Sequence, residues 1–441
     1  MNNLKFIFAL ALTFAASTVL FAQNRSFLGR NPLGTESDEG ASAVKMKLVA
    51  RTQSFNSDDL LKHDHYDQAI NSPKSVIFSS DGMKYYVNSL EGYTTHVFET
   101  QTHKKLSDIK HKFDADDKKL FLNNEYTVFD YEQKEGQENY NHFSGKPVES
   151  CLSHNGKYLW VTYYRRDWDN NAQYPSALAI IDTETDKIVR VMPTGPLPKM
   201  IAASPDNKYI CVTHWGDNTV AIIDIESDLP FEFKYTKHLA VGERIVLSYD
   251  ENVEIDRDND CGHCLRGTVF TENSKHLLVG RMGGAGGITV FQTSDFKSLG
   301  TVQGMKANVR HLEIVGNNLY LSSNRLGYVQ KCNVDDMILS LKNSQKSIYT
   351  FKRWKSAYVG IGARTISVTK DRKYIFAAVN NEKKIVVVRS SDMKVVSKIN
   401  ADPYPVGMAL SKYETRLMVT AQGKGGQGGG NSVTIYSIEY L

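Results

Sequence analysis

The sequence lacks three features that would narrow its function directly. Its net charge of +4 over 441 residues is too small to make nucleic acid or an anionic membrane a partner of the whole surface. No stretch after Phe21 is apolar enough to span a membrane. No Ser-His-Asp signature, nucleophile elbow or suitably spaced pair of carboxylates marks a catalytic centre. Function must therefore be sought in the distribution of residues along the chain.

The longest apolar run lies at the N-terminus. Lys5 precedes it, it extends from Phe6 to Phe21, and Ala22 before Gln23 is a plausible cleavage point. We expect residues 1–22 to be a signal peptide and residues 23–42, which are polar, to be a flexible leader. The mature protein is then exported, to the periplasm or outside the cell, and has no membrane span.

A short pattern returns seven times between residue 72 and the end of the chain. In most copies apolar or β-branched residues follow two and four places on, and six copies then reach a Ser or Thr before a polar turn. Strands that recur at intervals of about 40 to 75 residues predict an all-β fold, a seven-bladed β-propeller with four strands in each blade. The copies begin at Lys74, Val148, Lys199, Arg266, Arg310, Arg364 and Val406.

The last copy has no residues left for a fourth strand, because its third strand runs from Ser432 almost to Leu441. About residues 43–51, ahead of the first copy, form a strand pattern with Val44, Met46 and Leu48 on one face. We expect this strand to pair with the last blade and close the ring, since an open sheet edge is a liability. Residues 43–441 then form a single domain, with insertions near residues 107–145 and 228–264.

Two stretches resemble the YVTN-type β-propeller repeat. One is Ser-Pro-Asp-Asn-Lys followed by Tyr-Ile-Cys-Val-Thr and Val-Ala-Ile-Ile-Asp (residues 204–224); the other is Ser-Ser-Asp-Gly-Met-Lys-Tyr-Tyr-Val-Asn (residues 79–88). The resemblance implies a propeller over the mature chain. It implies little about activity, because cofactor-dependent dehydrogenase subunits, lactonases, haem-containing reductases and plain binding proteins share the fold.

Five copies of the repeat begin with a cation. The first strand of a propeller blade lines the central channel, so we predict that these side chains gather at one mouth of the channel and bind an anion. The alternative is that each pairs with a carboxylate of a neighbouring blade, such as Glu149 or Glu313, or an Asp that precedes Arg266. The five are Lys74, Lys199, Arg266, Arg310 and Arg364.

The loops between second and third strands should lie on the same face as the five cations. They hold exposed aromatic residues beside arginine, which recognition surfaces favour. Their glycine runs do not open a helix in a βαβ unit, which excludes a nucleotide-binding loop. From these loops we add Trp168, His214, Trp215, Arg281 and Arg325 to the predicted ligand-binding residues.

The segment before Arg266 contains Cys261 and Cys264 in a loop, and we predict a local disulfide between them. Asp256, Asp258 and Asp260 resemble the opening of a calcium-binding loop, but Cys261 stands at the turn glycine and Gly267 at the final glutamate. Calcium is therefore a weak candidate, and no other cofactor or metal is predicted.

These patterns favour an exported, non-enzymatic binding protein. Its ligand would be an anionic small molecule, a glycan or a partner protein held at the basic channel mouth. A propeller enzyme is the alternative, either a cofactor-dependent oxidoreductase subunit or a lactonase-like hydrolase. A basic ring disfavours the hydrolase, because propeller lactonases surround their metal with Glu, Asn and Asp. A scaffold that makes contacts through the two insertions is a third interpretation.

Overall fold

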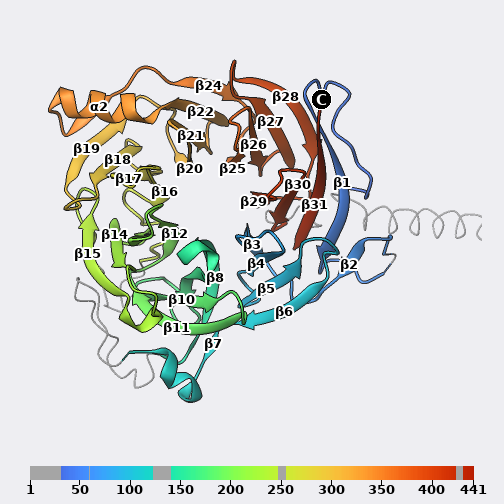
Figure 1. The fold of residues 1–441 in the computed structure, drawn as a ribbon, viewed down its shortest axis with the longest axis horizontal. Coiled ribbons are helices and arrows are strands. Elements are labelled where there is room, and N and C mark those ends of the chain that lie inside the picture. The colour runs from blue at the N-terminus through green and yellow to red at the C-terminus, as the bar shows by residue number, and fades with distance from the viewer. Residues whose placement is uncertain (1–30, 59, 123–140, 247–254, 424–430) are drawn as a thin grey trace, which may run out of the picture.

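The computed structural model is a ring of seven sheets, antiparallel except for one outer strand in each of two sheets, around a central channel (Figure 1). It describes residues 31–58, 60–122, 141–246, 255–423 and 431–441. The expected signal peptide, the leader up to residue 30, residues 123–140 and 247–254 of the two insertions, and the glycine run at 424–430 lie outside the described residues. The prediction of a seven-bladed all-β propeller is confirmed.

In blades 1 to 6 the chain runs from the innermost strand outward, with one exception in blade 2. Blades 1 to 3 are β3 (Pro73–Phe78), β4 (Lys84–Ser89), β5 (Thr94–Glu99) and β6 (Lys105–Lys110); β7 (Lys112–Phe113), β8 (Phe143–Ser153), β9 (Tyr158–Arg166), β10 (Ser176–Asp182) and β11 (Lys187–Thr194); and β12 (Pro198–Ala203), β13 (Tyr209–His214), β14 (Thr219–Asp224) and β15 (Lys234–Ala240). In blade 2 the two-residue β7 precedes the innermost strand, β8, and pairs with its start.

Blades 4 to 6 follow the same order. They are β16 (Leu265–Phe270), β17 (His276–Arg281), β18 (Gly287–Gln292) and β19 (Ser298–Gln303), with β23 (Ile348–Thr350) added at the outer edge; β20 (Val309–Val315), β21 (Asn318–Ser323), β22 (Tyr328–Asn333) and β24 (Lys355–Tyr358); and β25 (Ala363–Val368), β26 (Tyr374–Val379), β27 (Lys384–Arg389) and β28 (Lys394–Asn400). Short 3-10 helices η1 (Ala115–Leu120), η2 (His154–Gly156) and η3 (Pro230–Glu232) lie in connections.

Blade 7 is built from both ends of the chain. Its inner strands β29 (Pro405–Leu410), β30 (Arg416–Ala421) and β31 (Ser432–Tyr440) are joined by β1 (Val44–Gln53), which pairs antiparallel with β31, and then by β2 (Asp64–Tyr66). Figure 1 shows β1 running along β31 at the outside of the ring. The predicted closure is therefore confirmed, and the apolar face of β1 is buried as expected.

A buried arginine fixes the closing strand. Arg51 Nε lies 2.8 Å from Asp402 Oδ2 and its Nη1 lies 3.2 Å from Asp64 Oδ2, with all three side chains fully buried. These buried ion pairs hold β1 in its register against β31, because a shift would separate Arg51 from its partners and leave a buried charge uncompensated.

Residues 31–42 differ from the flexible leader that their polar composition predicts. Gly34 N–H donates to Leu48 O, Ser37 N–H to Met46 O, and Asp38 N–H to Lys398 O in blade 6. The segment is held by backbone hydrogen bonds to strands on either side of it, which composition does not reveal.

Two connections differ from the expected insertions. β15, the outer strand of blade 3, lies within the range assigned to the second insertion, so the connection to blade 4 begins only after Ala240. A further excursion, α2 (Val334–Ser344) followed by β23, separates the third and fourth strands of blade 5 and packs through Met337 and Leu341 on the core between blades 4 and 5. The repeat pattern of the sequence did not predict this helix and strand.

The Ser or Thr that ends most copies of the repeat stabilises the first hairpin of the blade. Ser204 Oγ donates to Asp206 Oδ1 at 2.6 Å and accepts from Tyr209 N–H at 2.9 Å. Thr369 makes the corresponding contact with Asp371. These side chains close the polar turn between the first two strands, which places the cation at the start of the strand on the opposite face of the ring.

Candidate functional site

The five cations of the repeat converge at one mouth of the channel. Each is the second residue of an innermost strand, in β3, β12, β16, β20 and β25, and those strands surround the channel in Figure 1. Burial and repulsion from Arg364, Arg266, Lys199 and Arg310 hold the pKa of Lys74 well below its usual range. The other four cations therefore lie close enough to destabilise the charged form of Lys74, as the radial symmetry of the repeat predicts.

Two of the five cations are paired with carboxylates. Lys199 Nζ lies 3.0 Å from Asp258 Oδ1, and Arg266 Nη2 lies 3.2 Å from Glu149 Oε1. Burial would raise the pKa of Asp258, but Lys199 and a hydrogen bond from Tyr164 outweigh it and lower that pKa to about 2. The expectation that neighbouring carboxylates neutralise the cations is thus correct for these two.

The other three cations have no carboxylate partner within the described part of the chain. Lys74 makes no ion pair there, the hydrogen bond of the Arg310 side chain there goes to Met282 Sδ at 3.7 Å, and Arg364 is hydrogen-bonded to Tyr404. Burial, together with Arg266, lowers the pKa of Arg364 to about 10. The mouth therefore carries an excess of positive charge on the side of Lys74, Arg310 and Arg364.

Aromatic rings surround the Lys199 end of the mouth. The Nζ atom of Lys199 lies 3.8 Å from the centre of the Tyr164 ring and 4.9 Å from that of Trp215. Both are cation–π distances. Burial lowers the pKa of Lys199 to about 7, with Asp258 opposing the shift. An anion entering the mouth would favour the protonated form.

Of the predicted loop residues, Trp215 belongs to the mouth, through its contact with Lys199. The contacts of Trp168, Arg281 and Arg325 lie elsewhere. Trp168 packs instead with Tyr174 and with the apolar core beside β7 and β8, Arg281 contacts His263 at 2.7 Å, and Arg325 is exposed in the loop between β21 and β22.

His214 is a correction to the predicted ligand-binding set. Its side chain is fully buried between blades 2 and 3, where Nε2 lies 2.8 Å from Thr194 Oγ1 of β11 and Nδ1 lies 2.7 Å from Thr219 Oγ1 of β14. Burial keeps its pKa well below the usual range, so the ring is a neutral structural element. The sequence pattern predicts an exposed loop at this position, but His214 is the last residue of β13.

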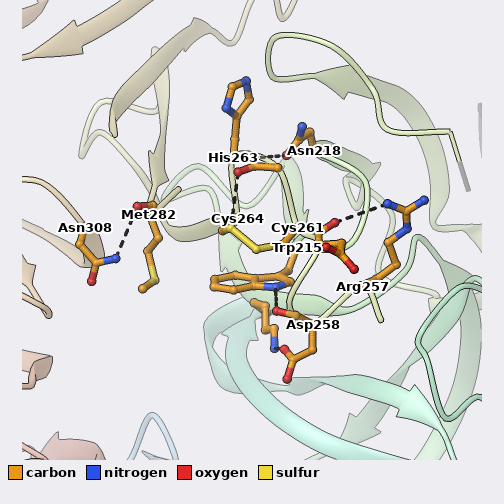
Figure 2. The surroundings of a disulfide bond; sticks show 12 residues. Trp215, Asn218, Arg257, Asp258, Cys261, His263, Cys264, Met282 and Asn308 are labelled. Carbon is orange, nitrogen blue, oxygen red and sulfur yellow. Dashed lines mark hydrogen bonds and ion pairs between the residues drawn. A yellow bond between two sulfur atoms is a disulfide. The ribbon is translucent and has the colours of Figure 1, made fainter. Parts of the chain in front are cut away.

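The predicted disulfide forms between Cys261 and Cys264. Figure 2 shows it above the indole of Trp215, whose Nε1–H donates to the carbonyl of Asp258 at 3.0 Å. His263 N–H donates to Asn218 Oδ1 at 2.8 Å and ties the loop to blade 3. The disulfide loop therefore carries Asp258, the counter-ion of Lys199, into the mouth.

Two of the three aspartates of the calcium hypothesis contact protein groups through their carboxylates. Asp256 Oδ1 accepts from Asp258 N–H, and Asp258 binds Lys199. In the described segments no group of three or more His, Cys, Asp or Glu side chains is arranged to hold a metal ion.

A cavity of about 550 Å³ lies in the channel and extends to Ser79 and Glu414, beyond the far ends of β3 and β29; none of the five cations is among its lining residues. Its wall includes Ser75, Glu149, His311 and Thr365, each one residue beyond a first position of the repeat. Deeper in the cavity, burial raises the pKa of Glu313 to about 8, and Glu313 Oε1 accepts from Val368 N–H at 3.1 Å. Burial lowers the pKa of His311 to about 4. Both groups are uncharged at neutral pH, so neither adds a charge to the cavity.

Tyr164 and Tyr404 belong to the mouth but were missed by sequence reasoning. Tyr164 follows a buried tyrosine in β9, and Tyr404 directly precedes blade 7. The Pro-Tyr-Pro at residues 403–405, which brings a ring to the start of an inner strand, was the available signal for the second.

Comparison with known proteins supports the fold and goes no further. No family model matches the chain, and no curated protein matches its sequence. Among solved structures, the β-propeller domain of Cps50 (Swd1) from Myceliophteria thermophila superposes with a TM-score of 0.56 at 11% identity, covering 83% of this chain and 96% of that one. The chain is thus a seven-bladed β-propeller, and at this identity nothing of the other protein's role transfers to it. No helix among the described residues is long and apolar enough to cross a membrane.

Proposed function

We propose that this protein is an exported, non-enzymatic β-propeller of the YVTN-repeat type that binds an anionic ligand at its basic channel mouth. One observation carries the proposal: five cations from five blades meet there, and only Lys199 and Arg266 have a carboxylate partner among the described residues. Gathering like charges costs free energy unless something compensates them. A bound anion would supply that compensation.

The burial of the cations limits the form of the ligand. Lys199, Arg266 and Arg364 are no more than 6% exposed, so a flat protein surface could not reach them. The ligand would be a small anion, or an anionic group that projects from a glycan or a partner protein. Guanidinium groups suit carboxylate and phosphate geometry.

Two features support export. The N-terminal segment has the layout of a secretory signal, and a disulfide of the Cys261–Cys264 type persists in oxidising compartments.

Titration calorimetry with citrate and with inorganic phosphate tests the proposal. We expect wild-type protein to bind at least one of them, with affinity that falls as salt rises. The variant Arg310→Ala with Arg364→Ala should fold and bind on the order of a hundredfold or more weakly, because two charge-assisted contacts are lost. The control, Arg353→Ala with Arg389→Ala, removes two arginines that form exposed ion pairs with Asp336 and Asp392 and should bind normally.

The same preparation separates binding protein from enzyme. An absorbance spectrum and a metal analysis of protein purified from its own host should show no chromophore and no stoichiometric metal. A bound redox cofactor would replace the proposal with the oxidoreductase alternative. If the double arginine variant unfolds, the arginines are structural partners and the anion site is misassigned.

A further inference from the structure

A chain of buried hydrogen bonds runs from blade 2 through blade 1 toward the channel. His111 Nδ1 lies 2.9 Å from Tyr163 Oη, His111 Nε2 lies 2.7 Å from Thr95 Oγ1, and Thr95 Oγ1 donates to Asn88 Oδ1 at 2.6 Å. All four side chains are at most 1% exposed. Burial lowers the pKa of His111 to about 3, so its ring is neutral and carries one N–H.

The hydrogen bonds of this chain share one direction when the amide oxygen of Asn88 faces Thr95. The hydroxyl of Thr95 then donates to Asn88 Oδ1, Thr95 Oγ1 accepts from His111 Nε2–H, and His111 Nδ1 accepts from the Tyr163 hydroxyl. In this arrangement the NH2 group of Asn88 is directed at Ser75 and Ser150.

The amide NH2 contacts two serines of different blades. Asn88 Nδ2 donates to Ser75 Oγ of β3 at 2.9 Å and to Ser150 Oγ of β8 at 2.8 Å. Each serine oxygen is therefore an acceptor, and neither hydroxyl proton meets a protein acceptor in the described segments. Both serines line the channel cavity, and Ser75 directly follows Lys74. A hydroxyl fixed in this way offers its proton to whatever occupies the cavity.

We propose that Ser75 and Ser150 form a fixed pair of O–H donors that binds oxygen atoms of the anion held by Lys74, Arg310 and Arg364, so that the ligand is an oxyanion. This inference rests on the proposed function and adds a specificity determinant to it. Asn88 is a positioning residue, because it acts through the two serines. The cations alone would accept any anion, whereas the donor pair selects one with several acceptor oxygens.

Two comparisons within the molecule support the assignment. Ser79 follows the other end of β3 and lines the same cavity, but its hydroxyl donates to Asp81 Oδ1 at 2.5 Å. A second buried histidine network, around His214, ends where Thr219 Oγ1 donates to Asp217 Oδ1 at 2.6 Å. Neither arrangement presents a donor to the channel, so the feature is not a general property of the repeat.

Calorimetry with the full chain tests the donor pair, with citrate and inorganic phosphate as separate probes. Ser75→Ala with Ser150→Ala should weaken binding of the preferred probe roughly tenfold to a hundredfold, since hydrogen bonds to a charged acceptor are lost. Ser79→Ala, the matched control, should bind normally. The stronger probe identifies carboxylate or phosphate as the ligand chemistry.

The salt dependence distinguishes lost donors from general damage. Removing neutral hydroxyls should leave the slope of log affinity against log salt unchanged, whereas the double arginine variant should flatten it. Asn88→Asp should weaken binding more than the serine pair does, because a carboxylate accepts from both serines and turns their protons away from the channel.

Two further outcomes would contradict the proposed function, the donor pair or both. If wild-type protein binds neither probe, both the proposed function and the donor pair are wrong. If wild-type protein binds and the arginine variant loses affinity, but the serine pair binds as tightly as Ser79→Ala, only the donor pair is wrong.

Discussion

Arg266 in blade 4 reaches past blade 3 to Glu149 in blade 2, with Nη2 3.2 Å from Oε1. This contact places a carboxylate among the cations at the mouth. The negative charge of Glu149 lowers the net positive charge of the mouth. Glu149 also lines the channel cavity.

Replacing that carboxylate should strengthen anion binding. In Glu149→Gln the amide oxygen can still accept from Arg266, but one negative charge is gone, and we expect the affinity for citrate or phosphate to rise by about tenfold, or ~1.4 kcal/mol. Calorimetry at fixed salt measures it. Asp392→Asn, which neutralises a carboxylate outside the channel, is the control. An unchanged or weaker affinity in Glu149→Gln would place the anion elsewhere.

The buried lysine gives the free protein an unusual pH dependence. The pKa of Lys199 is about 7 in the folded chain and about 10.4 when unfolded. Between pH 8 and 10 the unfolded state therefore binds more protons, and the free energy of unfolding rises with pH, by up to about 1.4 kcal/mol per unit for this group. Below pH 8, Glu313 works in the opposite direction, because its raised pKa keeps a proton in the folded state.

Denaturant unfolding at pH 8, 9 and 10 measures this slope. Lys199→Gln should have a smaller slope than wild type, while Lys208→Gln, at an exposed pair with Glu226, should keep it. Parallel curves for wild type and Lys199→Gln would show that Lys199 stays charged in the folded protein.

Reduction of the disulfide should loosen the loop that carries Asp258. The bond closes a loop of only four residues, so the loss is about 2 kcal/mol in the chain-entropy model. Dithiothreitol should lower the unfolding midpoint of wild-type protein and leave that of Cys261→Ser with Cys264→Ser unchanged. An equal effect of reductant on both proteins would assign it to something other than this bond.

The closing strand should depend on its buried arginine. Arg51→Ala removes the positive charge and leaves the buried carboxylates of Asp64 and Asp402 without it. We expect this to lower the free energy of unfolding by about 3–5 kcal/mol. Lys47→Ala on the same strand removes an exposed pair with Glu36 and should leave stability unchanged. Similar unfolding curves for the two variants would contradict the role given to Arg51.

The fold could be read from the sequence because its signal is repeated. Alternating apolar residues recur in each blade, and the missing fourth strand of the last copy identified β1 as its partner. The convergence of Lys74 with the other four cations followed from the same symmetry.

The rest of the site depends on contacts between residues far apart in the chain. Lys199 meets Asp258 through a loop whose path no periodic pattern describes, and the burial of His214 depends on where β13 ends. The chain from Tyr163 to Asn88 joins two blades through polar residues that are unremarkable in their own strands. Symmetry predicts the positions that every blade shares and says nothing about what one blade alone possesses.

Pairing β1 with β31 sets an order of events for a newly made chain. Val44 lies opposite Tyr440, so the ring cannot close until the residues of β31 have left the ribosome. Contacts across so large a separation are slow to form. Until then β1 keeps an unpaired edge, which can pair wrongly with strands of other chains.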